Sequence, residues 1–220
     1  MDVHPKVIPS KVSRRRTQVE RRAQGEKALL DAAAELFAAQ GIVQTSLAQI
    51  GQRAGYSRGL VNHHFGTKDA LIDRLARQCQ EQFWKAFAEI DVETGLEGIL
   101  ATIDTYLAQI VSPAPHGRAF LVMRAAALPE ASMAPTIAEA DERTREVFVS
   151  WIETGHRDGS ISRRVKAEPF AAILLGLLHG LAAQLFVAPD AVDMGALRSQ
   201  CHDVVRAALE EREPRREERQ

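Results

Sequence analysis

Residues 46–65 read SLAQIGQRAGYSRGLVNHHF and predict two short helices joined by a tight turn. Leu47, Ile50 and Ala54 recur at helical spacing, so one face of the first helix is expected to be buried. Gly55 follows this helix and can adopt the left-handed conformation that ends a helix and redirects the chain. The stretch therefore predicts a helix, a glycine turn and a second helix.

Small and polar residues add detail to this prediction. Ser46 and Gln49 have the spacing of a capping box, and Ser57 can cap the second helix. Gly51 lies mid-helix, where glycine costs about 1 kcal/mol relative to alanine. A second helix crossing closely at Gly51 would explain that choice. The arrangement is that of a helix-turn-helix, and an ordinary helical hairpin within an all-α core is the alternative.

The second helix has an inner and an outer face. Val61 and Phe65 lie one turn apart and are expected to point inward. In a helix-turn-helix the second helix enters the major groove of DNA, where its outer side chains meet base edges. The residues on that outer face are Arg58, Gly59, Leu60, Asn62 and His63.

Composition places the chain among soluble helical proteins. It has 220 residues, of which 45% are hydrophobic but only 5% aromatic, and alanine and leucine are frequent. This bias favours helices over sheets, so an all-α fold is expected. Cys79 and Cys201 belong to no metal or redox spacing, and no metal is expected. The N-terminus has no apolar secretory segment, so a cytoplasmic protein is expected.

Charge is distributed unevenly. Residues 1–70 contain 11 lysines and arginines against 6 acidic residues, whereas residues 71–220 contain 17 against 23. Residues 1–24 show no apolar helical stripe and are predicted to form a flexible basic arm, with residues 211–220 as a charged tail. Such an arm can neutralise DNA phosphates, and a solubilising tail is the alternative. The cations proposed to act in it are Arg14, Arg15 and Arg16.

The longer segment TSLAQIGQRAGYSRGLVNHHFGTKDAL (45–71) closely resembles the signature of TetR-type transcriptional regulators. The resemblance implies a three-helix DNA-binding domain at 25–67 and a larger helical domain at 68–210 that binds a small ligand and dimerises. Ser46, Ser57 and His64 are also expected on the DNA side, and Lys68, beside the start of the next helix, is well placed for a DNA phosphate. The chain departs from the family pattern at Leu60 and Asn62, so operator preference cannot be carried over from relatives.

The rest of the chain is predicted to be helical. Helices are expected at 68–90, 94–111, 118–128, 135–154 and about 194–209, with a turn at 155–159. Residues 170–188 are almost wholly apolar, which suits either a membrane span or a helix buried in a dimer core. We expect the dimer core, in which this helix pairs with the last one to form a four-helix bundle with the partner. The residues expected at that interface are Gly176, Leu177, Gly180 and Leu181.

No catalytic constellation, phosphate loop or cofactor motif is visible, so no enzyme and no cofactor are expected. A ligand pocket would lie between the helices of the second domain. The candidates, each of which could equally be core, are Phe87, Tyr106, Phe120, Met123, Arg124, Trp151 and His179. For Arg124, a ligand-facing role and an internal ion pair both stay open.

Three functional hypotheses result. The leading one is a homodimeric DNA-binding regulator, a repressor that leaves a palindromic operator when a small-molecule effector of unknown identity binds. The second is a helical ligand-binding protein or small enzyme in which the helix-turn-helix is only scaffold. The third is a membrane-tethered sensor that uses residues 170–188.

Overall fold

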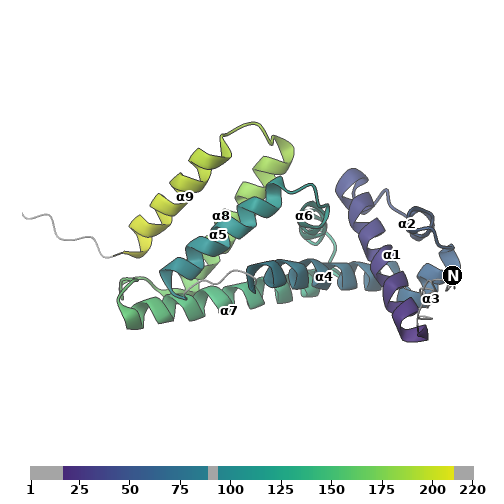
Figure 1. Ribbon diagram of the computed structural model, residues 1–220, viewed down its shortest axis with the longest axis horizontal. Coiled ribbons are helices and arrows are strands. Elements are labelled where there is room, and N and C mark those ends of the chain that lie inside the picture. Colours follow the sequence, from purple (N-terminus) through teal and green to yellow (C-terminus); the bar gives the residue numbers. More distant parts are fainter. Residues whose placement is uncertain (1–16, 89–93, 211–220) are drawn as a thin grey trace, which may run out of the picture.

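The computed structural model describes residues 17–88 and 94–210, and in these ranges the chain forms nine α-helices and no strand. Figure 1 shows α1–α3 gathered at one end and α5, α7, α8 and α9 at the other, with α4 leading from the first group into the second. The predicted all-α class, with a helix-turn-helix before a larger helical part, is confirmed. The helices are α1 (Gln18–Gln40), α2 (Leu47–Ala54), α3 (Arg58–Phe65), α4 (Lys68–Ala88), α5 (Leu96–Val111), α6 (His116–Ala126), α7 (Ala134–Asp158), α8 (Ala167–Val187) and α9 (Met194–Leu209).

The first helix begins within residues 1–24, the stretch predicted to be a flexible arm. The hydroxyl of Thr17 accepts a hydrogen bond from the Glu20 N–H, and the Glu20 carboxylate accepts one from the Thr17 N–H at 2.7 Å. This capping box satisfies the first free amides and starts α1 at Gln18. The expectation of a flexible arm over residues 1–24 is therefore corrected for residues 18–24. Arg14, Arg15 and Arg16 lie outside the described residues.

One apolar core joins α1–α3 to parts of the larger half. Leu29 and Phe37 of α1, Ile50 of α2 and Val61 of α3 are fully buried in it. The same core continues into α4 and takes in one side of α6 and the start of α7 through Leu71, Leu75, Ala119, Met123 and Ile137. A displacement of α4 or α6 would therefore change the packing around α1. The boundary predicted between residues 67 and 68 stays a prediction.

A second apolar core holds α5, α7, α8 and α9 together. Its fully buried centre is formed by Ile99 of α5 with Phe148 and Ile152 of α7. Leu174 and Leu178 of α8 and Leu209 of α9 complete it. The larger half is thus a helical bundle with its own core.

The turn predicted at residues 155–159 is instead the last turn of α7. Gly155 is buried in the helix, and a Cβ atom there would overlap the side chain of Ile161. Gly159, at φ 84°, ends the helix in the left-handed conformation. The two glycines therefore serve different purposes: the first allows close packing and the second ends α7.

The helix α8 is apolar on all sides but only partly covered. Its most apolar 18 residues have a mean hydropathy of 2.0 and are 33% buried. Ile173 and Val187 are 62% and 86% exposed, and a Cβ atom at Gly176 or Gly180 would meet nothing within 4 Å. By length and composition α8 is the one helix in the described ranges that could cross a membrane.

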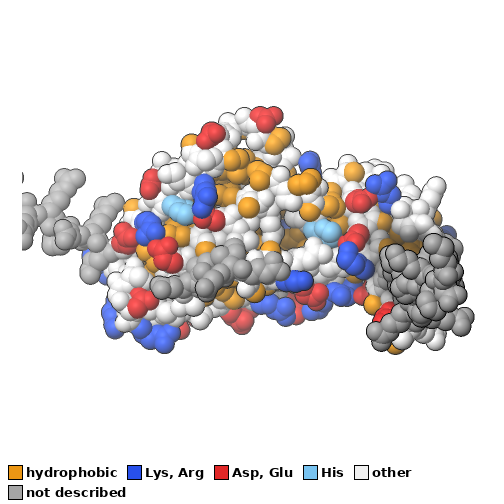
Figure 2. Space-filling view, viewed as in Figure 1, with side chains coloured by type: hydrophobic (Ala, Val, Ile, Leu, Met, Phe, Trp, Pro, Cys, Tyr) orange, Lys and Arg blue, Asp and Glu red, His pale blue; other side chains and the backbone are white. Residues whose placement is uncertain are grey.

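The last helix packs mainly on α5, not on α8 as the sequence suggested. Arg198 and His202 of α9 both bind Asp104 of α5, and Arg206 binds Glu97 of α5 at 2.8 Å. The start of α8 and the end of α9 flank an open groove lined by Pro169, Phe170, Ile173, Ala207 and Ala208. Figure 2 shows Lys, Arg, Asp and Glu side chains along the lower edge over α7, with hydrophobic side chains gathered above it over α5 and α8.

Candidate nucleic-acid interface and ligand pocket

The turn between α2 and α3 is held by a close approach at Gly51. The Tyr56 N–H donates to the Gly51 carbonyl oxygen at 2.8 Å. A Cβ atom on Gly51 would lie 2.9 Å from the Tyr56 oxygen and 3.0 Å from Cγ2 of Val61. Gly55, at φ 77°, ends α2 in the left-handed conformation. The local fold therefore needs glycine at both positions.

Helix α3 is anchored by its inner face and capped by Ser57. The Ser57 hydroxyl accepts the Leu60 N–H at 3.3 Å, and Val61 is fully buried. Across the helix, Arg58, Asn62 and His63 are exposed, and Leu60 is partly exposed. Within the described residues, Arg58 and Asn62 form no side-chain hydrogen bond or ion pair. The outer face of α3 thus presents a cation and an amide that can bind an outside partner.

Ser46 and Gly59 lie at the N-terminal ends of α2 and α3. Ser46 is exposed and caps α2 by accepting the Gln49 N–H at 3.3 Å. Gly59, in the first turn of α3, is exposed and has open space where a side chain would begin, apart from Ser57 Oγ at 3.7 Å. Both allow a large partner to approach the N-terminal ends of the two helices.

His64 is directed toward α1. Its Nε2 would lie 3.4 Å from a Cβ atom on the buried Gly25 of α1, and its Nδ1 is buried with no partner in the described part of the chain. Burial lowers the pKa of His64, so the imidazole is biased toward the neutral form. The structure gives His64 a packing position between α3 and α1.

Lys68 is also engaged with the protein. Its Nζ donates a hydrogen bond to the Ile42 carbonyl oxygen at 2.6 Å. Burial lowers the pKa of Lys68. This bond ties the start of α4 to the connection between α1 and α2. The ammonium that the sequence suggested for a DNA phosphate is therefore turned inward in this structure.

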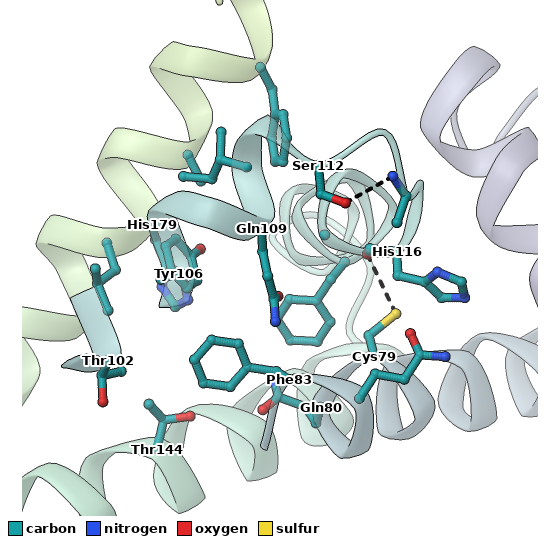
Figure 3. A pocket seen from close by; sticks show the side chains of 18 of the residues that line it. Cys79, Gln80, Phe83, Thr102, Tyr106, Gln109, Ser112, His116, Thr144 and His179 are labelled. Carbon is teal, nitrogen blue, oxygen red and sulfur yellow. Dashed lines mark hydrogen bonds between the residues drawn. The ribbon is translucent and has the colours of Figure 1, made fainter. Parts of the chain in front are cut away.

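A cavity of about 290 Å³ lies between α4, α5, α6, α7 and α8. Figure 3 shows Thr102, Tyr106, Thr144 and His179 around one end, Cys79, Ser112 and His116 around the other, and Phe83 and Gln109 between them. The described lining residues are Cys79, Gln80, Gln82, Phe83, Thr102, Tyr106, Gln109, Ile110, Ser112, Ala114, His116, Gly117, Phe120, Thr144, Leu175, Leu178, His179, Ala182 and Phe186.

Three of the seven predicted pocket residues line this cavity: Tyr106, Phe120 and His179. Phe87 and Trp151 instead stack on each other with ring centroids 5.2 Å apart, and Met123 is fully buried in the first core. Sequence reasoning missed Phe83, Thr102, Gln109, Thr144 and Phe186. Thr102 and Thr144, which lie on otherwise apolar helix faces, are the sequence feature that could have indicated a polar group in the cavity wall.

Arg124 forms an internal ion pair. Its guanidinium binds both carboxylate oxygens of Asp141 on α7, one of them at 2.8 Å, and both side chains are about four-fifths buried. The structure thus contains the ion pair that was one of the two possibilities for this residue, and the ligand-facing role stays a prediction. Two opposite charges beside the cavity largely compensate each other.

The polar end of the cavity is uncharged. Burial and the nearby Arg124 lower the pKa of His179 to about 4, so its imidazole is neutral at neutral pH. Burial raises the pKa of the Tyr106 phenol, which keeps its proton. The hydroxyls of Thr102 and Thr144 donate to the carbonyls of Gly98 and Ala140 at 2.9 and 3.0 Å. Their oxygens can still accept hydrogen bonds.

Two family models cover most of the chain. The one described as bacterial regulatory proteins of the tetR family matches residues 29–75, and the one described as the C-terminal part of a BetI-type transcriptional repressor matches residues 95–210. The second match alone spans more than half of the 220 residues. The chain belongs to the TetR family. It is accordingly a DNA-binding transcriptional regulator of the repressor type, and the family is not enzymatic.

Curated relatives agree with this assignment. The chain is 28% identical over 173 residues to the transcriptional repressor BepR of Brucella suis, covering 76% of this chain and 82% of BepR. It is 27% identical over 142 residues to the repressor KstR2 of Rhodococcus jostii, covering 64% of this chain and 69% of KstR2. The regulator BetI of Paraburkholderia xenovorans is 39% identical over 66 residues, or 30% of this chain and 32% of BetI.

Solved structures of TetR-like regulators share the fold. A regulator from Saccharomonospora viridis in complex with choline aligns with a TM-score of 0.75 at 18% identity, covering 86% of this chain and all of that one. GusR of Salmonella enterica aligns with a TM-score of 0.71 at 22% identity, covering 84% of this chain and 95% of GusR. At these identities the likeness concerns the fold alone.

In this TetR-family chain, the cavity wall is connected to the helix-turn-helix half by a polar cluster. His116 starts α6, and its Nε2 lies 3.2 Å from Oδ1 of Asp31 on α1. The Gln78 amide of α4 donates to the same oxygen at 3.2 Å, and the Cys79 thiol lies 3.5 Å from the His116 carbonyl oxygen. Both Cys79 and His116 line the cavity. This cluster therefore joins the cavity wall to α1.

Proposed function

We propose that the chain acts as a homodimer that represses transcription by placing α3 of each copy in successive major grooves of a palindromic operator. The observation that carries this proposal is the exposed outer face of α3, where Arg58 and Asn62 have no partner in the described residues. In such dimers the two recognition helices must lie about 34–36 Å apart.

The proposed DNA contacts divide by chemistry. Asn62, Leu60 and His63 would face base edges, since an asparagine amide can pair with adenine and an apolar side chain can contact the thymine methyl group. Arg58 and the Arg14, Arg15 and Arg16 run would bind phosphates, with Ser46, Ser57 and Gly59 at the backbone contact surface. Because their side chains are directed to α1 and Ile42, we assign His64 and Lys68 the role of supporting α3 and α4.

The dimer would form through α8. Its exposed apolar face carries Ile173, Gly176, Gly180 and Val187, with Leu177 and Leu181 partly buried beside it. The two glycines would let the backbone of a partner helix come close. A second copy covering this face would explain why so apolar a helix is only one-third buried, and a cytoplasmic protein would need no membrane there.

Release from DNA would follow from effector binding in the 290 Å³ cavity. A neighbour of this fold holding choline supports a small-molecule effector in general. A ligand can shift the equilibrium only by its differential affinity for two conformations. The contacts of His116 with Asp31, and of α4 with α1, are the route by which a change in the cavity would alter the spacing of the two α3 helices.

Selection of bound sequences from a random DNA pool tests the central claim. The full chain should enrich an inverted repeat whose half-site centres lie about one helical turn apart. Footprinting of the selected sequence should then show one dimer per repeat. Enrichment of unrelated sequences, or of a single half-site, would contradict dimeric operator reading.

A further inference from the structure

The cavity combines polar groups with a lining that, in the described residues, contains no Asp, Glu, Lys or Arg. We propose that the effector is an uncharged, mostly apolar molecule that donates at least one hydrogen bond to the Thr102 and Thr144 end of the cavity. This inference rests on the proposed function, because it takes the cavity to be the effector site.

An anionic ligand would find no counter-charge there. The described lining residues include no Asp, Glu, Lys or Arg. Two guanidiniums face lining rings without lining the cavity themselves: that of Arg124 binds Asp141 through both carboxylate oxygens, and that of Arg118 faces the Phe186 ring. The lining histidine at the other end, His116, already lies 3.2 Å from Asp31. Moving a carboxylate or sulfonate from water into such a site costs free energy that no cation repays. An anion is therefore disfavoured.

A cationic ligand is disfavoured for a different reason. Aromatic rings can hold ammonium groups, but the Phe120 and Phe186 rings already each face a guanidinium, with Arg124 at 5.7 Å and Arg118 at 5.8 Å from the ring centroids. No Asp or Glu is among the described lining residues to balance an ammonium group in their place. A cation is therefore disfavoured as well.

The polar end of the cavity offers hydrogen-bond acceptors, so the ligand should carry a hydrogen-bond donor. The Thr102 and Thr144 hydroxyl protons are directed to helix carbonyls, so their oxygens offer only lone pairs to the cavity. The buried Oε1 of Gln80, another lining residue, has no partner in the described part of the chain. A hydroxyl, amide or aryl-amine N–H would satisfy these acceptors, and Tyr106 lines the same end of the cavity (Figure 3).

The remaining wall suits an apolar body. Phe83, Phe120, Leu175, Leu178 and Phe186 line it. A volume of about 290 Å³ equals roughly ten water molecules at their share of liquid volume, so the site accepts a small molecule of one or two rings. Burial of that body would supply most of the affinity, and the donor would orient it.

Two dyes with the same ring frame test the charge preference. N-phenylnaphthylamine is uncharged and has one N–H donor, whereas anilinonaphthalene sulfonate adds a single negative charge. In fluorescence titrations of the full chain, the uncharged dye should bind once per protomer and at least about tenfold more tightly, since the sulfonate must be desolvated without a partner. Choline should not displace it. Equal affinity for the two dyes, or displacement by choline, would overturn the proposal.

Matched threonine variants locate the dye. Thr144→Val should weaken binding of the uncharged dye about three- to tenfold by removing one acceptor. Thr105→Val is the control, because Thr105 makes the same bond to its helix carbonyl at 2.9 Å but does not line the cavity. Equal losses in the two variants would overturn the assignment. If Thr144→Val does not fold by circular dichroism, Thr102→Val replaces it.

The titration requires no DNA, so the two proposals can fail separately. A chain that prefers the uncharged dye but enriches no operator would refute the proposed function and leave only the charge preference of the cavity standing. A chain that binds an operator and shows no dye preference would refute the ligand class alone.

Discussion

At the residue scale, two positions separate reading DNA from maintaining the fold. Asn62 is exposed on α3 without a partner in the described residues, whereas Gly51 is buried where α2 meets α3. A substitution at Asn62 should therefore mainly weaken DNA binding, whereas a substitution at Gly51 should mainly lower the free energy of unfolding.

Asn62→Ala should weaken binding to the selected operator by about tenfold, because a paired amide contributes roughly 1–3 kcal/mol of base discrimination. The free energy of unfolding should stay within about 0.5 kcal/mol of wild type, as for other surface changes. Fluorescence anisotropy and chemical denaturation measure the two quantities. Gln200→Ala, exposed on α9, is the control, and unchanged operator affinity in Asn62→Ala would remove this residue from the interface.

Gly51→Ala should destabilise the chain by about 1–3 kcal/mol through overpacking, partly offset by the better helix propensity of alanine. The new methyl group would lie 2.9 Å from a backbone oxygen, which cannot move without opening the turn. Gly59→Ala, made where space is open, should be neutral or slightly stabilising in the same denaturation experiment. If both variants unfold at the same denaturant concentration, the close approach at Gly51 is not limiting.

His179 should make stability depend on pH. Its pKa in the folded chain is about 4, against 6.5 for the ordinary group, so between these values the unfolded state binds more protons. Stability is therefore lost as the pH falls from 6.5 toward 4, by up to the order of 3 kcal/mol. His179→Gln should flatten this part of the curve in denaturation series at stepped pH. The exposed His63→Gln is the control, and an equal flattening there would refute the assignment.

At the element scale, local signals explain which helices could be predicted. Ser46 with Gln49, Ser57 and Gly55 act on their own backbone neighbours, and the structure confirms the capping and turn roles predicted for them. Gly155 misled because a buried glycine and a turn glycine look alike in sequence, and only the contact with Ile161 separates them. Likewise, helical spacing identifies Phe87 and Arg124 as inward but not which neighbours, Trp151 and Asp141, they meet.

The helix α8 carries the prediction about assembly. Gly176→Leu should convert the proposed dimer into a monomer at micromolar concentration, because the larger side chain would hold a partner helix away. Gly176→Ala is the control with the smallest added side chain. It should remain dimeric, since a Cβ atom there meets nothing in the single chain. Sedimentation velocity distinguishes the species. A stable dimer of the leucine variant would show that α8 is not the interface.

At the scale of the whole molecule, the uneven distribution of charge follows the division of the chain into a helix-turn-helix part and a helical bundle. The basic third precedes and includes the helix-turn-helix, while the acidic remainder forms the bundle around the cavity. The two parts pack directly against each other through the shared core of α1, α4 and α6. The distribution of charge and the order of the helices could be predicted from sequence. The cavity lining could not, because it depends on five helices meeting at one place.

The last prediction concerns residues 1–16, which contain five lysines and arginines and one aspartate. Their removal should reduce the slope of log affinity against log salt by about 3 if Arg14, Arg15 and Arg16 each neutralise one phosphate. The deletion must stop before Thr17, since that residue caps α1, and deletion through residue 20 would confound lost charge with a damaged helix. A full chain with all three arginines changed to glutamine should reproduce the shallower slope. An unchanged slope in both variants would show that the arm does not touch DNA, whereas a change in the deletion alone would assign the effect to Lys6 and Lys11.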